Sequence, residues 1–415
     1  MDIEEKILNK LNKNFLLERV KIRPVKQYTR DKLFFIKKYE KQDYIQHRLT
    51  KMQPFFLELL EISEFKSVNH TSQTHFYTFG MIVSPNGSKI TEDNVYLASN
   101  IDGSNEVPVK LNLKYLKKYS LFPGEIVAIL GKNTNGNEIY VEEIHCMPIL
   151  DINPIYDAEK KRNEKIYQTP LEIICCSGPY LVNDTNSLSI ILLKNPDLFI
   201  LHGPFITTPS SSMAPMEYFK SEIIDKLEAW LRQSLYSKII LIPTIDDILT
   251  LGIYPQFPIN LKGINDRIII MSNPCQFYVN EFLFGSSTLD ILLSLTSEEC
   301  FYNGEHGIND QCSDLLFSDD RPARMAYHVV FQKSFLPVFP CKDSVNLGAS
   351  DILDMDVTPD FLILSSKIRH FSKNIGPSVV INTGIQSKPE NKRYGKIVIG
   401  DDSKQRYKVT LESWI

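Results

Sequence analysis

The stretch Leu171-Glu172-Ile173-Ile174-Cys175-Cys176-Ser177-Gly178-Pro179-Tyr180 decides the fold class. It is a continuous apolar run that ends in a turn containing glycine and proline, which is typical of a strand buried on both faces of a sheet. Similar runs recur at residues 198–201, 239–242, 268–271, 361–364 and 379–382. Between the second and third runs, apolar residues at every fourth position predict an amphipathic helix: Phe219, Ile223, Leu227 and Leu231. The alternation predicts a layered α/β domain over residues 151–415.

Residues 67–150 have the pattern of a small β-barrel. Aromatic and β-branched residues fill positions 76–83, and apolar and polar residues alternate over positions 107–113. Two further strands are predicted at 125–130 and 138–144. The Asn135-Gly136 pair between them favours a tight hairpin, because glycine readily adopts a positive φ.

Residues 1–66 look helical and basic, with an amphipathic pattern from Tyr28 to Glu61. The basic residues of the first 30 positions include Lys6, Lys10, Lys13, Arg19, Lys21, Arg23, Lys26 and Arg30. A nucleic-acid-binding arm is one interpretation, and a solvated helical face or flexible leader is the other, which we favour.

Composition narrows the class of protein. The 415 residues carry a net charge of −4 and a pI of about 6.1, which does not suggest a protein whose main function is to bind the phosphate backbone of nucleic acids. The seven cysteines are odd in number and lack a CxxC pair, so we expect free thiols in a reducing compartment. The sequence shows neither a signal peptide nor an apolar stretch long enough to span a membrane, so we expect an intracellular, soluble protein.

The loops after the predicted strands are poor in metal ligands. A two-metal hydrolase needs several Asp, His and Asn side chains converging from such loops. The candidates here are few and scattered: Asp184, His202, Asp246, Asp247 and Asn273. His202 is either a metal ligand or general base, or a hydrogen-bonded histidine at a strand end, and the missing partners favour the second. His306 needs no role beyond its place in a polar loop.

The order and spacing of several motifs resemble the B subunit of eukaryotic DNA polymerase alpha–primase. The matching segments are Tyr119-Ser120-Leu121-Phe122-Pro123-Gly124, Cys176-Ser177-Gly178-Pro179-Tyr180, Leu201-His202-Gly203-Pro204-Phe205, Tyr254-Pro255-Gln256-Phe257-Pro258, Asn273-Pro274-Cys275, Phe284-Gly285-Ser286-Ser287-Thr288-Leu289-Asp290, residues 332–340, residues 358–364 and Ile381-Asn382-Thr383-Gly384. One departure is Thr207, where the family often has Asp. Many relatives also carry a long N-terminal extension, whose tethering role we expect to be absent or reassigned here.

The resemblance implies an OB-fold barrel at residues 67–150 and a calcineurin-like phosphoesterase α/β sandwich at 151–415 whose catalytic metal ligands are gone. Active relatives carry Asp, His and Asn ligands in the corresponding loops. The degenerate positions here are Ser177, Pro179, Pro204, Thr244, Asp246, Asn273 and Ser365. The resemblance implies no catalytic residue, metal or cofactor.

The resemblance also implies a nuclear, non-catalytic scaffold that binds the C-terminal domain of the polymerase alpha catalytic subunit and works with the primase subunits. Contact with single-stranded DNA is expected to be weak or indirect, although Phe76, Tyr77 and Phe79 are candidates for base stacking. Four aromatic residues near the strand-end loops are candidate interface anchors or core residues: Tyr180, Phe205, Tyr254 and Phe257. The alternatives are an active phosphodiesterase or 3′-exonuclease, the corresponding subunit of polymerase delta or epsilon, and an independent single-strand-binding protein.

Overall fold

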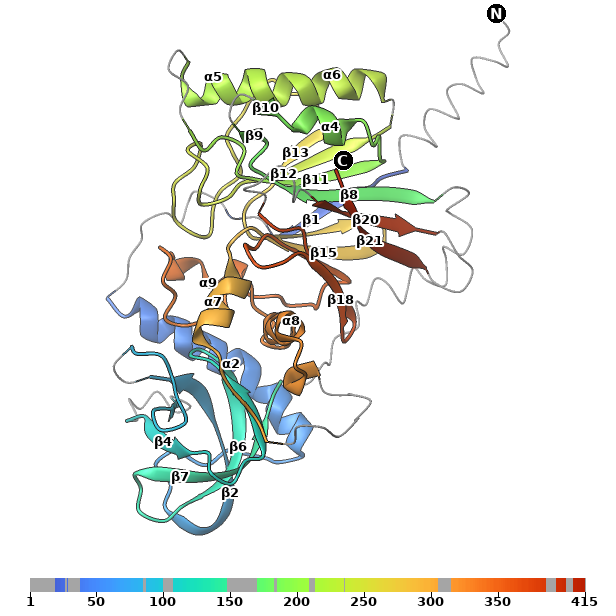
Figure 1. The fold of residues 1–415 in the computed structure, drawn as a ribbon. Helices are drawn as coiled ribbons and strands as arrows, with labels where there is room; N and C mark the ends of the chain where they lie inside the picture. The colour runs from blue at the N-terminus through green and yellow to red at the C-terminus, as the bar shows by residue number, and fades with distance from the viewer. Residues whose placement is uncertain are drawn as a thin grey trace, which may run out of the picture.

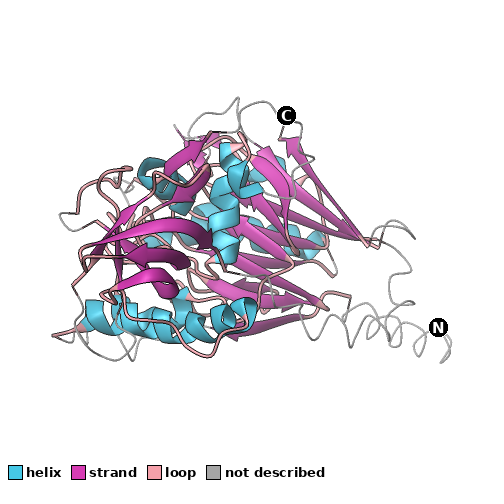
Figure 2. Ribbon diagram, turned by 90° about the horizontal axis from the view of Figure 1, so that it is seen from below, coloured by secondary structure: helices cyan, strands magenta, loops and turns pink. Residues whose placement is uncertain are grey.

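A computed structural model describes residues 19–26, 28, 38–84, 87–99, 107–147, 170–182, 185–208, 213–234, 236–304, 315–385, 393–400 and 406–414. Six residues discussed above lie outside the described residues: Lys6, Lys10, Lys13, Arg30, Asp184 and His306. Strands make up much of the described chain (Figure 2). The described cysteines are all free thiols. No helix in the described ranges combines the length and apolar character that crossing a bilayer requires.

The larger domain contains two six-stranded sheets (Figure 1). The first has the order β13-β12-β11-β8-β20-β21 and the second β1-β14-β15-β17-β19-β18. The strands of the first sheet are β8 (Leu171–Ser177), β11 (Leu198–His202), β12 (Lys238–Ile242), β13 (Ile268–Ile270), β20 (Arg393–Ile399) and β21 (Tyr407–Ser413). Those of the second are β1 (Ile22–Lys26), β14 (Cys275–Val279), β15 (Phe282–Ser287), β17 (Phe361–Leu364), β18 (Phe371–Ile375) and β19 (Ser378–Asn382).

An apolar core fills the space between the two sheets, and helices cover their outer faces. Buried residues from both sheets pack there, among them Ile173, Ile240, Phe284 and Ile363. The first sheet is covered by α4 (Leu188–Leu192), α5 (Pro215–Phe219), the π-helix η2 (Lys220–Ile224) and α6 (Asp225–Gln233). The second is covered by α7 (Ile291–Glu298), α8 (Arg321–Phe331) and α9 (Ser350–Leu353). Short elements complete the domain: β9 (Leu181–Val182), β10 (Thr185–Asn186), β16 (Cys300–Asn303), η3 (Leu315–Phe317) and η4 (Leu347–Ala349).

This architecture is a layered α/β domain, as the pattern of the sequence predicted. Each of the six apolar runs forms a strand at its predicted place, and β8, β11, β12 and β13 run parallel. The predicted amphipathic helix forms as α5, η2 and α6 in continuous succession.

The smaller domain is a closed barrel with an OB-fold strand order, β2-β3-β4-β7-β6. Its strands are β2 (Ser72–Val83), β3 (Tyr96–Ala98), β4 (Val109–Asn112), β6 (Ile126–Asn133) and β7 (Glu138–His145). Strands β6 and β7 form the predicted antiparallel hairpin, with Gly136 at φ 81° in its turn.

The helical prediction for residues 1–66 is wrong at β1, which pairs antiparallel with β14 at the edge of the second sheet. The reason is the partner strand: an exposed row of backbone groups on β14 outweighs the local preference of residues 22–26. The helix α2 (Glu40–Leu60) does form, and it touches both domains. Phe56 packs on Phe79 of the barrel, and Tyr44 donates a hydrogen bond to the carbonyl of Leu336. The boundaries after residues 66 and 150 remain a prediction.

The barrel is docked directly on the sandwich (Figure 1). β5 (Lys118–Leu121), which leads into β6, pairs antiparallel with β16. The side-chain amide of Gln332 on the sandwich accepts a hydrogen bond from the Ile126 N–H and donates one to the Ile126 carbonyl, both at 3.0 Å. Phe339 N–H donates to the Pro123 carbonyl at 2.9 Å. The barrel therefore packs on the sandwich through specific backbone contacts.

Gly124 is the tightest point of this contact. Its φ is +97°, and a methyl group added there overlaps the backbone nitrogen of Phe339 and the carbonyl oxygen of Pro337. We expect Gly124→Ala to lower the free energy of unfolding by about 3 kcal/mol or more, since steric overlap adds to backbone strain. Gly263→Ala is the matched control, because Gly263 has φ +73° and open space around it, and it should cost only about 1–2 kcal/mol. Urea unfolding measures the unfolding free energy of both variants. An equal loss of unfolding free energy in the two would show that the contact at Gly124 does not exclude a side chain.

Candidate functional site

Five buried polar side chains meet at the carboxyl ends of the sandwich strands, and we call them the hydroxyl centre. Ser177 ends β8, His202 ends β11, Ser286 lies on β15, and Ser365 and Thr383 follow β17 and β19. Each is at most 1% exposed. This is the edge of the sheets at which α/β proteins place their ligand sites.

The hydroxyl centre is a connected hydrogen-bond network. The Ser177 hydroxyl lies 2.7 Å from the Ser365 hydroxyl and 2.6 Å from that of Thr383. The His202 ring joins the two sheets, with Nδ1 2.6 Å from the Ser365 hydroxyl and Nε2 2.7 Å from that of Ser286. Because hydroxyl groups both donate and accept, they can satisfy both nitrogens of a neutral imidazole.

His202 is therefore a hydrogen-bonded residue at a strand end, the interpretation favoured from sequence. Burial lowers the pKa of His202 to about 3, so the ring is neutral at physiological pH. Both ring nitrogens already have hydroxyl partners, which leaves no free lone pair for a metal ion. No cluster of three or more His, Cys, Asp or Glu side chains suited to a metal occurs in the part of the chain that the structure describes.

Asp247 ties two strand-end loops together. Its carboxylate accepts hydrogen bonds from the backbone N–H groups of Phe205 and Ile206 after β11 and of Thr244 after β12. Burial raises the pKa of Asp247 to about 7, and the three N–H donors oppose this rise. Its neighbour Asp246 is exposed, whereas Asp247 is buried. The two adjacent acids therefore do not form a paired-carboxylate site.

The remaining degenerate positions are equally occupied by structural contacts. The Asn273 side chain donates to Gln256 at 2.8 Å and accepts from the Thr288 N–H at 3.0 Å. Pro179 and Pro204 have neither a donor nor a ligand atom on the side chain, and their loops pack against each other, since Gly178 N–H donates to the His202 carbonyl at 3.0 Å. The sequence did not single out Ser286, Thr383 or Gln256. The signal that could have identified them is their residue type and position: each carries a hydroxyl or an amide and lies in one of the motifs quoted above.

Three of the four predicted interface anchors belong to the interior. Tyr180, Phe205 and Tyr254 are at most 1% exposed. Tyr180 stacks on Phe205, and the Tyr254 hydroxyl lies 3.0 Å from that of Ser287. The expectation that they present a surface is corrected: the loops fold back over the sheet edge, so their large apolar rings complete the core. Phe257 differs, because it is only partly buried and stacks on Tyr28 with ring centroids 4.4 Å apart.

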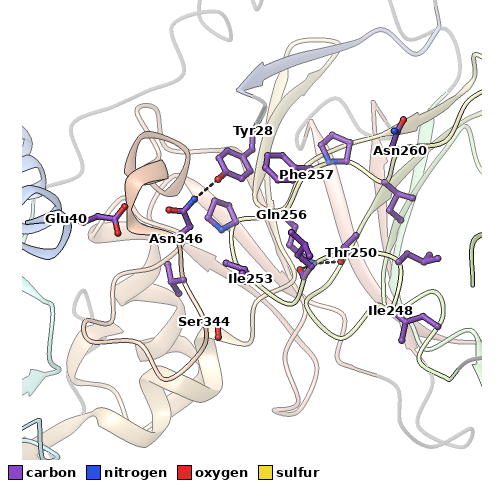
Figure 3. Close-up of a pocket in the computed structure, with 16 residues that line it drawn as sticks. Tyr28, Glu40, Ile248, Thr250, Ile253, Gln256, Phe257, Asn260, Ser344 and Asn346 are labelled. Carbon is purple, nitrogen blue, oxygen red and sulfur yellow. Dashed lines mark hydrogen bonds between the residues drawn. The ribbon is translucent and has the colours of Figure 1, made fainter. Parts of the chain in front are cut away.

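Phe257 lines a hollow of about 920 Å³, which we call the Phe257 groove (Figure 3). Its walls come from distant parts of the sequence: Tyr28, Glu40, residues 248–251, Ile253, residues 255–260 and residues 344–346. Gln256 ties the groove to two strand-end loops of the sandwich. Its side-chain amide donates to the Thr244 carbonyl and accepts a hydrogen bond from Asn273.

Comparison with known proteins gives consistent matches. Residues 173–373 match the family model for the B subunit of DNA polymerases alpha and epsilon, and residues 42–147 match the model for the OB domain of the DNA polymerase alpha B subunit. The chain is similar to the DNA polymerase alpha B subunit of Schizosaccharomyces pombe, with 30% identity over 87% of this chain and 66% of that protein. The mouse protein is 25% identical over 81% and 56%. The Saccharomyces cerevisiae protein is 26% identical over 85% and 57%, so the chain spans less than two thirds of the length of each of these three relatives.

Among solved structures, Entamoeba histolytica Vps29 complexed with zinc is similar to 59% of this chain and 100% of that protein. The identity is 10% and the TM-score 0.23.

The burial of His202 makes stability depend on pH. A histidine whose folded-state pKa is depressed contributes stability above its ordinary value of 6.5, and this is lost as the pH falls toward 3. We expect the unfolding free energy to fall by about 1.4 kcal/mol per pH unit on this account below pH 6. His202→Gln, measured by urea unfolding between pH 7 and 4.5, should lack this slope. His70→Gln, at an exposed histidine, should keep it, and identical slopes in all three proteins would contradict the assignment.

Proposed function

Since the chain belongs to the family of DNA polymerase alpha B subunits, we propose that it is a non-catalytic scaffold of the DNA polymerase alpha–primase complex in the initiation of replication. The observation that carries this proposal is the hydroxyl centre. A hydrolytic site needs charged ligands that hold metal ions and activate water. The corresponding loops here hold neutral hydroxyls and a neutral imidazole that satisfy one another.

The proposed partner is the C-terminal domain of the polymerase alpha catalytic subunit, with the primase subunits in the same nuclear assembly. Family membership supports the choice of partner. The rigid docking of barrel on sandwich supports the role, because a scaffold needs surfaces at fixed relative positions. The match of residues 42–147 to an OB domain of the alpha type favours polymerase alpha over delta or epsilon.

A direct role in gripping single-stranded DNA is not part of the proposal. Two of the three candidate stacking residues, Phe76 and Phe79, are 8% and 0% exposed, so their ring faces are not available to bases. With a net charge of −4, the chain also gains little from counterion release. We therefore expect any contact of this chain with single-stranded DNA to be weak or indirect.

The proposal predicts no phosphodiesterase activity. Purified chain incubated with manganese and a model phosphodiester should give only background hydrolysis, because the buried hydroxyls bind no metal strongly. His202→Ala serves as the control for trace contamination. Turnover by the wild-type chain that disappears in His202→Ala would overturn the non-catalytic assignment.

The proposal also predicts a stable complex. Co-expression with the full-length polymerase alpha catalytic subunit should give one species on size exclusion that persists at 1 M salt, where the Debye length is only about 3 Å. A permanent interface buries roughly 2,000 Å² or more, largely apolar area, which salt does not screen. Separate elution of the two chains at micromolar concentration and moderate salt would remove the main support for a scaffold.

A further inference from the structure

The Phe257 groove has an apolar wall that faces solvent. Ile248 is 38% and Leu251 is 53% exposed, although both side chains are aliphatic and lie on a loop held firmly by Asp247 and Gln256. Pro255, Phe257 and Pro258 continue this wall toward Tyr28. Ordered, exposed apolar side chains gathered around a hollow mark an interaction surface.

Among the described residues, one charged side chain lines the groove, and none of them forms an ion pair with it. Glu40 stands at the start of α2, at the end of the groove away from Ile248 (Figure 3). Its Oε1 is buried and has no hydrogen-bond partner among the described residues. Two other polar side chains of the lining are held by hydrogen bonds: the Asn346 amide donates to the Tyr28 hydroxyl at 2.8 Å, and Gln256 is bonded to the Thr244 carbonyl and to Asn273.

We propose that the Phe257 groove binds a segment of the polymerase alpha catalytic subunit that carries apolar side chains and a lysine or arginine placed against Glu40. This inference rests on the proposed function and names the surface that it uses. The apolar side chains cover Leu251, Ile248 and Phe257, and the basic side chain meets the unpaired carboxylate. The arrangement is that of an apolar anchor with a charged group fixing its register.

The chemistry of the walls disfavours other classes of ligand. A nucleic acid finds no cation among the described lining residues and is repelled by Glu40. A small polar metabolite needs several convergent donors and acceptors, but the exposed Asn260 side chain lies at the opposite end of the groove from Glu40 and Ser344 (Figure 3). A polypeptide segment satisfies both the apolar wall and the single negative charge.

The test uses the full chain and the full-length catalytic subunit. Dissociation is followed by biolayer interferometry for wild type, Leu251→Glu, Ile248→Glu and Glu40→Gln. Leu193→Glu is the matched control, since Leu193 is 82% exposed at the end of α4 and does not line the groove. Thermal unfolding of each chain alone checks that the exposed substitutions leave the fold intact.

We expect Leu251→Glu and Ile248→Glu to speed dissociation by roughly tenfold or more, with the control within about twofold of wild type. Glu40→Gln should speed dissociation at low salt and flatten its salt dependence, because a charge pair is lost. If wild type binds and all variants dissociate like the control, the groove is not the docking site, while the scaffold function stands. If wild type does not bind, both proposals fall.

Two further outcomes also overturn the groove assignment. If Leu251→Glu lowers the melting temperature of the isolated chain and leaves dissociation unchanged, the chain itself fills the groove. If size exclusion shows a dimer of the isolated chain that Leu251→Glu disrupts, the occupant is a second copy.

Discussion

Arg324 of α8 donates hydrogen bonds to both oxygens of Glu299, at 2.8 and 3.1 Å, and this buried pair anchors the junction between barrel and sandwich. The Ser120 hydroxyl, from the barrel, donates to Glu299 at 2.9 Å and lies 2.8 Å from Nε2 of His328. The other ring nitrogen of His328 faces Glu125 at 3.5 Å. Since all five side chains are at most 5% exposed, undocking the barrel removes the Ser120 hydroxyl from Glu299 and His328 and separates Glu125 from His328, which is costly for buried polar groups.

The protonation of this junction follows from its geometry. Burial alone raises the pKa of Glu299, but the Arg324 guanidinium and the Ser120 hydroxyl more than offset it, so its pKa lies below the ordinary value. Burial raises the pKa of Glu125, opposed by His328. A single relative placement of the domains satisfies these groups together, and α2 reinforces it by donating from Arg48 to the Gln332 carbonyl at 2.9 Å. The groove, which combines α2 with sandwich loops, depends on that placement.

The sequence predicted those features that are local. Strands buried on both faces, such as β8 and β11, are continuous apolar runs, and the β6–β7 hairpin is set by its own turn. The strand β1 could not be predicted this way, because Ile22 pairs with Val279 and Pro24 lies within an edge strand with an irregular register. The burial of Tyr180 could not be predicted either, because an aromatic ring after a strand suits a core and a surface equally.

The strand-end loops of the sandwich are held together largely by hydrogen bonds between uncharged side chains. Several carboxylates gathered at one edge repel one another and need cations to hold them together. In the hydroxyl centre, each contact joins groups that carry no charge, and His202 stays neutral because burial lowers its pKa to about 3. The loops are then fixed by hydrogen bonds that need no ion, and Asp247 holds the loop bearing Ile248 and Leu251 through backbone donors. Hydrogen bonds of this kind need no ion, so a surface built on such loops suits the proposed scaffold function.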